Sequence, residues 1–487
     1  MRFDAVVIGG GSAGASAGAR LAQLGHSVCI VERSACARPP AVESLSPGIW
    51  PLIEIMGSLG GILQEKFVRP ELTLIHWEKS GIRQKAQHAG HKGLLVDRRR
   101  FDSVLLRTAI ETGVHVVRSA RVRLHGPYHE GKWRLDVEGD SATTIECRYL
   151  IDASGRQGFL GRGGGDFGGC YRATSPPTVA LCGCLQSGVP PGTTMVEAIA
   201  DGWIWGASLT EGRCAVMVLC DTERVRADRG KGLEAIWRGF LSKAELFRAV
   251  AEAKTVGSLH LRDATASFHR VPISEGFLRA GESNYSIDPL SSTGVEKAMR
   301  GGLTAGTVVH TLLKHPERAN LCEQFYLARQ QEDVYRHAAW AAAFYGEAAR
   351  FADRPFWKRR AHLTIPEPNR TAAQSTEDQL ADAADTEWTW SDTVRVRLAG
   401  GVELRREPCI VGNEIEPTLS IMSPKLERPV AFLNGIPIGT MLGEMIGALQ
   451  PRTLVPSFVR HIPAGQIAQV WCWLLEKRIF EVIPPGE

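Results

Sequence analysis

The first clear pattern in the chain is a short apolar run that leads into glycines and then into a helical repeat. Residues 3–8 are strand-like, and Gly9-Gly10-Gly11-Ser12-Ala13-Gly14 follows them directly. A second apolar run covers residues 27–31. Strand, glycine loop, helix and strand in this order predict a Rossmann-like α/β unit over about the first 35 residues.

The rest of the chain alternates between two kinds of pattern. An amphipathic helix is predicted from residue 97, and strands are predicted near 72–77, 114–117 and 149–152. Short strands separated by Gly, Pro and Asp dominate from about residue 178 to 269, with one helical stretch at 232–253. These strands predict a separate antiparallel sheet.

The pattern changes again after two helical stretches near residues 294–309 and 321–351. A polar, proline-containing linker is expected at 362–387, and a small α+β domain follows, with a winged-helix arrangement as one candidate. The predicted organisation is a nucleotide-binding domain in three pieces (1–70, 96–175, 271–361), an interleaved sheet domain (71–95, 176–270), the linker and a C-terminal domain (388–487).

Composition narrows the class of protein. The chain has 487 residues, 44% of them hydrophobic and 23% charged, and a formal net charge of +4, which does not point to nucleic acid or to an anionic membrane. No apolar stretch is long enough to span a bilayer, and the N-terminus has the pattern of a core strand and not of a signal peptide. The 11 scattered cysteines suggest reduced thiols, so we expect a cytoplasmic protein; the Cys182-x-Cys184 spacing does not favour a metal site.

The glycines carry the first candidate chemistry. Gly9 permits a tight turn, Gly11 lets the backbone approach a pyrophosphate, and Gly14 lets the helix pack closely on the strand. Glu32 follows the second strand, where an acid accepts hydrogen bonds from ribose hydroxyls. A second glycine-rich run at 161–165 follows no clear strand. One resident dinucleotide, best FAD, is therefore predicted, and its reductant must come transiently or from a partner.

Several further motifs occur in a fixed order. They are Asp-Arg-Arg-Arg-Phe-Asp at 97–102, Asp-Ala-Ser-Gly-Arg at 152–156 and Asp-Pro-Leu-Ser-Ser-Thr-Gly-Val at 288–295. With the glycine fingerprint and Glu32, this order resembles the FAD-dependent aromatic hydroxylase family, whose fold is that of p-hydroxybenzoate hydroxylase, over residues 1–351. Glu43-Ser44-Leu45-x-Pro47 and Trp203-x-Trp205 resemble the branch that contains the tryptophan halogenases.

The resemblance implies a non-covalent FAD site and a small set of residues beside the flavin ring. The implied FAD ligands are Gly9, Gly11, Ser12, Ala13, Gly14, Glu32, Arg33, Glu43, Ser44, Arg100 (or Arg98), Asp152, Ala153, Ser154, Asp288, Thr293, Gly294 and Val295. Pro289, Ser291 and Ser292 are the implied residues at the reacting centre, with Lys79 as a further candidate. Trp77, Trp203 and Trp205 are candidates for substrate contact; sheet packing is the alternative for them.

Two departures from the halogenase pattern bear on the reaction. Family halogenases carry Trp-x-Trp-x-Ile-Pro, whereas Ala207-Ser208 occupies the last two places here. Halogenases also need a lysine, and Lys79 is more simply a surface charge. The resemblance therefore favours oxygenation of an electron-rich aromatic ring through a flavin C4a-hydroperoxide, with O2 and NADH or NADPH, or a partner reductase, as co-reactants.

Three classes of reaction and substrate remain open. The appended C-terminal domain resembles the arrangement in flavoprotein monooxygenases of tryptophylquinone biogenesis for quinohemoprotein amine dehydrogenase, which implies a tryptophan in a partner polypeptide docked by that domain. The alternatives are a halogenase or hydroxylase of a small or carrier-bound aromatic, and a flavin reductase of the geranylgeranyl reductase type.

Overall fold

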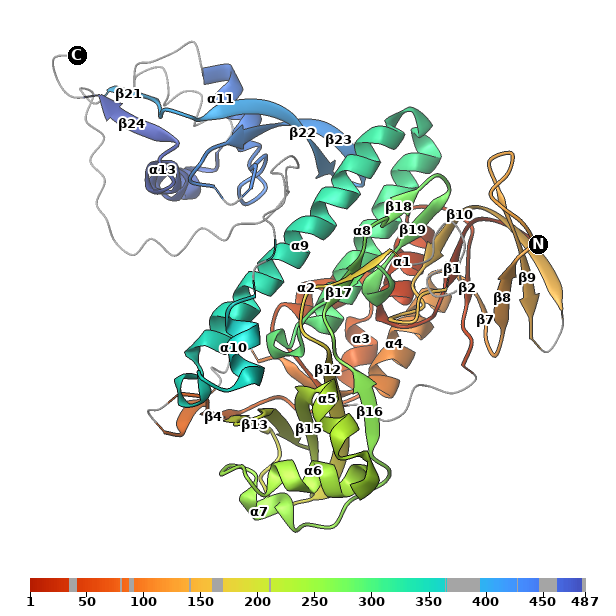
Figure 1. The fold of residues 1–487 in the computed structure, drawn as a ribbon. Helices are drawn as coiled ribbons and strands as arrows, with labels where there is room; N and C mark the ends of the chain where they lie inside the picture. Colours follow the sequence, from red (N-terminus) through yellow and green to blue (C-terminus); the bar gives the residue numbers. More distant parts are fainter. Residues whose placement is uncertain are drawn as a thin grey trace. The chain divides into compact units, whose positions relative to one another are not determined.

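The computed structural model describes residues 1–34, 42–78, 81–86, 92–139, 142–159, 170–209, 212–363, 365, 395–426, 428–445 and 462–483. The chain divides into two compact units (Figure 1). One unit comprises residues 1–309 and 330–367, and the other comprises residues 310–329 and 368–487. Residues 310–329, which we expected within the nucleotide-binding domain, thus group with the C-terminal residues. Most of the expected linker, from residue 366, lies outside the described residues.

The nucleotide-binding part is built on a mixed sheet with β1 (Arg2–Ile8) at its centre. β1 pairs in parallel with β10 (Thr143–Asp152) on one side and with β2 (Val28–Val31) on the other. Ala5, Val6 and Val7 are fully buried because a parallel strand is covered on both faces. The α/β Rossmann-like prediction is confirmed.

The nucleotide-binding part contains further strands and helices. The strands are β3 (Val42–Leu45), β6 (Leu94–Asp97), β7 (His115–Val117), β8 (Arg121–Leu124), β9 (Trp133–Glu138), β11 (Tyr171–Ala173), β17 (Ser267–His269), β18 (Ile273–Ser274), β19 (Phe277–Arg279) and β20 (Tyr285–Ser286). The helices are α1 (Ser12–Gln23), α2 (Ile49–Met56), α3 (Leu59–Gln64), α4 (Arg98–Glu111), α8 (Gly294–Lys314), α9 (Ala319–Glu347) and α10 (Pro355–Ala361).

A second sheet forms the interleaved domain, in the order β16-β12-β15-β14-β13-β4-β5. Its strands are β4 (Leu72–His76), β5 (Arg83–Ala86), β12 (Thr178–Gln186), β13 (Thr193–Ile199), β14 (Gly202–Ser208), β15 (Arg213–Asp221) and β16 (His260–Asp263). The pairs β12–β15, β15–β14 and β14–β13 are antiparallel, whereas β4 joins β13 in parallel.

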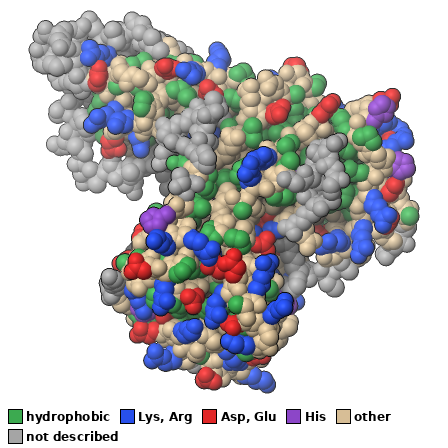
Figure 2. Space-filling view, viewed as in Figure 1, with side chains coloured by type: hydrophobic (Ala, Val, Ile, Leu, Met, Phe, Trp, Pro, Cys, Tyr) green, Lys and Arg blue, Asp and Glu red, His purple; other side chains and the backbone are tan. Residues whose placement is uncertain are grey.

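The two faces of this sheet differ in what covers them. One face, which includes Leu181, Ile204 and Val218, packs against α6 (Leu233–Leu241) and α7 (Arg248–Ala251). The sequence predicts a single helix at 232–253, but the structure has two helices there, α6 and α7. A further helix, α5 (Thr222–Ala227), precedes them. Acidic and basic side chains intermingle over this helical side of the domain (Figure 2). The opposite face carries Trp203 and Trp205.

The C-terminal unit has its own apolar core. It contains β21 (Arg395–Leu398) paired with β24 (Phe480–Ile483), β22 (Glu403–Val411) paired with β23 (Glu414–Met422), and the helices α11 (Ile438–Met445) and α13 (Ile467–Glu476). Within the unit, the carboxylate of Glu414 pairs with Lys314 and Arg318, and the amide of Ile415 donates to Thr311 Oγ1 at 2.9 Å. These contacts connect residues 310–329 with the C-terminal residues of the same unit.

The length and composition of the helices bear on whether one of them crosses a membrane. Across the described ranges, none of them combines the length and the apolar character that crossing a bilayer requires.

Candidate functional site

Residues from both sheets of the first unit line one large cavity. Its volume is about 1320 Å³, and its wall runs from the glycine fingerprint and the end of β2 to the strands of the second sheet. The segment from Ile287 to Ala298 contributes a further side. A small-molecule site typically measures roughly 300–1,000 Å³, so this cavity has room for a dinucleotide and a second molecule.

Close backbone packing explains the fingerprint glycines. Gly9 has φ +104°, and a Cβ at this position would lie 2.6 Å from the carbonyl oxygen of Ala153. A Cβ on Gly14 would lie only 1.9 Å from the carbonyl oxygen of Gly9. This packing places Gly11, Ser12 and the first turn of α1 at the cavity, where unpaired helical N–H groups favour a phosphate.

Glu32 lies at the end of β2, beside the same loop. Its carboxylate accepts hydrogen bonds from the amides of Gly10 at 2.6 Å and Ser34 at 2.8 Å, and it lines the cavity. These bonds fix the carboxylate where it can also accept from ribose hydroxyls. Arg33, Glu43, Ser44, Ala153 and Ser154 line the cavity as well.

Arg98, at the start of α4, is the arginine of the 97–102 motif that lies deepest in the site. Its guanidinium pairs with Glu43 at 2.8 Å and Asp102 at 3.0 Å. Burial alone would lower its pKa, but the carboxylates of Asp102 and Glu43 raise the pKa of Arg98 overall. In the described part of the chain, its buried Nε has no hydrogen-bond partner, which suits an anionic ligand at this wall.

Arg100 occupies a different place. Its guanidinium pairs with Glu65, its side chain is 54% exposed, and it is not among the described residues that line the cavity. The helical turn between positions 98 and 100 points the two side chains to different sides. We therefore assign the phosphate-facing role to Arg98 and not to Arg100.

Replacing Arg98 with alanine should weaken FAD binding by about ten- to a hundredfold, because a charge-assisted hydrogen bond contributes roughly 1.5–3 kcal/mol. Titration of the apoprotein with FAD measures the effect. Arg100→Ala is the control and should bind FAD like the unaltered protein. Equal losses in the two variants would contradict the assignment.

The 288–295 motif forms the opposite wall. Asp288 caps a short 3-10 helix (Pro289–Ser291) by accepting from the amide of Leu290 at 3.0 Å, and Ser292 takes a left-handed φ of +51°. Asp288, Pro289 and Ser292 line the cavity, as do Gly294 and Val295 at the start of α8. Ser291 and Thr293 do not line it in the described structure; their side chains bond to each other at 3.0 Å instead.

Asp152 is placed differently from the expectation that it binds the cofactor. Its side chain is fully buried, pairs with the equally buried Arg279 at 3.0 Å, and accepts from the amides of Ser154 and Phe159. It is not among the described residues at the cavity wall. With its oxygens held by protein donors, Asp152 shapes the loop that presents Ala153 and Ser154.

The three candidate tryptophans also separate. Trp203 and Trp205 line the cavity, whereas Trp77 is 4% exposed, donates to the carbonyl of Phe344 and packs edge-on against Trp203 and Trp357. Trp77 is thus a packing residue behind the wall. Lys79 lies outside the described residues.

Two further residues contribute polar groups here: Lys297, which sequence reasoning missed, and Tyr345, which the sequence offers only as part of an aromatic and basic rim, with helix packing as the alternative. Lys297, on the first turn of α8, lines the cavity; burial lowers its pKa to about 8, and its Nζ donates to the carbonyl of Tyr285. Tyr345, on α9, hydrogen-bonds to Asp288. Lys297 occurs in an ordinary helical pattern, and nothing in that pattern marks it as a polar residue facing a cavity.

Comparisons with known proteins agree with this geometry. A tryptophan halogenase family model matches residues 74–408, and an FAD binding domain model matches residues 4–47. A tryptophan 2-halogenase of Chondromyces crocatus is 29% identical over 371 residues, which is 72% of this chain and 69% of the relative.

Two solved structures are similar over nearly the whole chain. One is the peptidyl tryptophan dihydroxylase QhpG, essential for tryptophylquinone cofactor biogenesis, with a TM-score of 0.71 and 25% identity over 98% of this chain and 99% of that one. The other is CmlS, a flavin-dependent halogenase, with a TM-score of 0.75 and 20% identity over 100% and 96%.

The residues fit FAD. The glycine loop, Glu32, the unpartnered Nε of Arg98 and the start of α8 surround one continuous cavity, and each offers the donor or acceptor that a part of the dinucleotide requires. The chain belongs to the tryptophan halogenase family of FAD-dependent oxidoreductases.

Proposed function

We propose that this protein is an FAD-dependent monooxygenase that hydroxylates a tryptophan side chain in a partner polypeptide, as in quinone cofactor maturation. The cavity beyond the nucleotide end is the observation that carries the proposal. Its wall there contains a row of side chains from three paired strands, Cys182, Met217 and Trp205, with Trp203 beside them. Thioether and indole groups favour contact with an aromatic ring.

FAD would supply oxygen activation once bound non-covalently and reduced by NADH, NADPH or a partner reductase. The chain's own groups bind and orient. The first turn of α1 and Arg98 would hold the phosphates, Glu32 would accept from the ribose, and the start of α8 at Gly294 and Val295 would stabilise negative charge on the flavin. Pro289 lines the same wall.

Oxygenation is favoured over halogenation by the sequence of β14. Ala207-Ser208 replaces the Ile-Pro of the halogenases, and both residues are fully buried. The likeness to a peptidyl tryptophan dihydroxylase over almost the full length of both chains supports a polypeptide substrate. The C-terminal unit is then the proposed docking surface, and remote docking of this kind helps to position the reacting ring.

The decisive measurement is the mass of a tryptophan-containing polypeptide after incubation with the full chain, FAD, reductant and O2. We expect a gain of one or two oxygen atoms on tryptophan. Bromide or chloride in the mixture should leave this product unchanged.

Other masses identify the alternatives. Incorporation of halogen would establish a halogenase, and addition of two hydrogens would establish a reductase of the geranylgeranyl reductase type. Conversion of a free aromatic in preference to every polypeptide would contradict the docking role of the C-terminal unit.

A further inference from the structure

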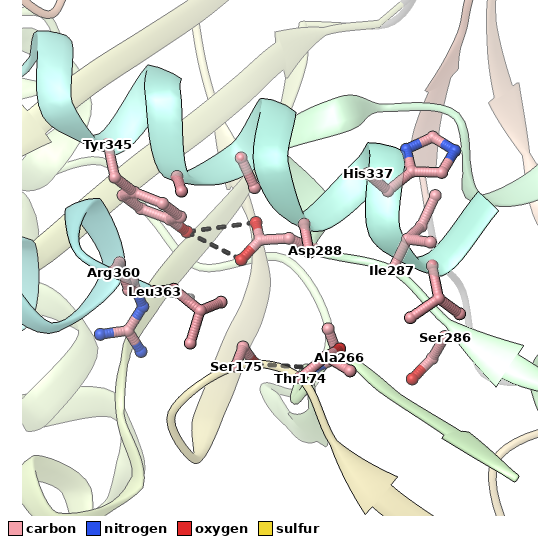
Figure 3. Close-up of a pocket in the computed structure, with 14 residues that line it drawn as sticks. Thr174, Ser175, Ala266, Ser286, Ile287, Asp288, His337, Tyr345, Arg360 and Leu363 are labelled. Carbon is pink, nitrogen blue, oxygen red and sulfur yellow. Dashed lines mark hydrogen bonds between the residues drawn. The ribbon is translucent and has the colours of Figure 1, made fainter. Parts of the chain in front are cut away.

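Tyr345 connects two walls of the cavity. Its hydroxyl lies 3.1 Å from both carboxylate oxygens of Asp288, and the indole Nε1 of Trp203 donates to that hydroxyl at 3.2 Å (Figure 3 shows the pair with Asp288). A hydroxyl has one proton to donate and lone pairs to accept with. The direction of both hydrogen bonds is therefore fixed: the indole donates to the tyrosine hydroxyl, and the tyrosine hydroxyl donates to the carboxylate.

The surrounding aromatic residues fix where this hydroxyl lies. The ring of Tyr345 is buried and packs edge-on against Phe356 and Trp357, with centroid distances of 6.0 and 5.8 Å. The guanidinium of Arg360 lies over the ring of Phe356 at 3.7 Å. A hydroxyl on a ring held this way loses little entropy when it binds Asp288.

Asp288 depends on such donors because it is only 6% exposed. Its carboxylate otherwise accepts from the amide of Leu290. Tyr345, Arg360 and His337 line a small cavity beside it, of about 20 Å³ (Figure 3), which is enough for roughly one water molecule. The charges of Arg360 and of Arg156, after β10, also act on this carboxylate.

We propose that Tyr345 is a positioning residue that couples the substrate-facing wall at Trp203 to the flavin-facing carboxylate of Asp288. A change in the orientation of Trp203 alters the hydrogen bonding of the Tyr345 hydroxyl. That change in turn alters the charge and the orientation of the Asp288 carboxylate. The inference deepens the proposed function, on which it rests for the role of Trp203 as part of the substrate wall.

The coupling has an electrostatic consequence for bound FAD. Burial raises the pKa of Asp288, and the hydrogen bonds from Leu290 and Tyr345 oppose this effect. Loss of the tyrosine hydroxyl should therefore raise the pKa of Asp288 further, so that the carboxylate takes up a proton at a higher pH. A neutral Asp288 repels the negative charge of a reduced flavin less, and the midpoint potential should become more positive.

The test follows the midpoint potential and absorption spectrum of bound FAD as a function of pH, without substrate. Protonation of Asp288 should appear as a step in this pH dependence. In Tyr345→Phe, that step should move to higher pH by about one unit, which is the effect of losing one hydrogen bond to a charged group. Trp203→Phe keeps an aromatic ring and should move the step the same way by a smaller amount. Asp288→Asn should remove the step, and Tyr345→Phe should then have no further effect on it.

Tyr285→Phe is the matched control, because it deletes a comparable bond, from Tyr285 to Asp333 at 2.7 Å, in a residue that is not among those lining the large cavity. It should leave the step in place. An unshifted step in both Tyr345→Phe and Trp203→Phe would overturn the proposal, as would an equal shift in Tyr285→Phe. Because no substrate is present, a shifted step would stand even if no polypeptide were hydroxylated.

Discussion

Replacing Gly14 with alanine is expected to weaken FAD binding severely. The new Cβ would lie 1.9 Å from the carbonyl oxygen of Gly9 and 3.3 Å from the Cβ of Ala153. The backbone of Gly9 cannot yield easily, because Gly9 is itself packed so closely that a Cβ there would lie 2.6 Å from the carbonyl oxygen of Ala153, the residue after β10. Helix α1 must therefore move away from β1, which takes the phosphate-facing amides with it.

We expect the affinity for FAD to fall by about a hundredfold or more, since overpacking alone costs roughly 1–3 kcal/mol and the binding loop is also displaced. Flavin retained after purification and FAD titration of the apoprotein both measure it. Gly60→Ala is the matched control: it lies in α3 with open space around the added Cβ, and alanine is the better helix former. A Gly14→Ala protein that binds FAD normally would refute the proposed packing.

The second large effect is expected on stability, at the buried pair of Asp152 and Arg279. Both side chains are 0% exposed, and their ion pair of 3.0 Å joins β10 to β19. Asp152→Ala removes the carboxylate that pairs with the buried guanidinium of Arg279 and the acceptor of the Ser154 and Phe159 amides. Breaking a buried pair in this way costs about 3–5 kcal/mol.

Denaturant unfolding of the apoprotein tests this expectation without interference from FAD. Arg2→Ala is a suitable control, because it removes an arginine–glutamate pair of similar length, 3.1 Å, whose arginine is 85% exposed. It should change the unfolding free energy far less, since water screens the pair. If Asp152→Ala were as stable as Arg2→Ala but bound FAD poorly, Asp152 would be a cofactor ligand after all.

The nucleotide-binding end of this protein could be predicted from sequence because its determinants are local. In β1 and α1, strand, turn and helix follow each other within a short segment, and each glycine has a steric reason to be there. Glu32 follows the next strand directly. Residues so close in sequence hold nearly the same arrangement in any chain that forms this unit.

The remaining site residues depend on contacts between distant segments. Neighbouring positions differ by which side they face: Arg98 faces the cavity, whereas Arg100 pairs with Glu65. Trp77 and Trp203 are both buried tryptophans, but only the strand order of the second sheet brings Trp203 to the wall. The periodicity of hydrophobic positions predicts on which face of a helix or strand a residue lies. It does not predict which residue of another element lies opposite.

The sequence by itself determined the Rossmann-like unit, its dinucleotide fingerprint and the presence of a second sheet. The tertiary structure alone decided that Asp152 is buried against Arg279, that residues 310–329 group with the C-terminal residues, and that Tyr345 meets Asp288. The physical reason is the same in each case. A charge or hydroxyl acquires its role from a partner that lies tens to hundreds of residues away, and only the packing of whole elements brings the two together.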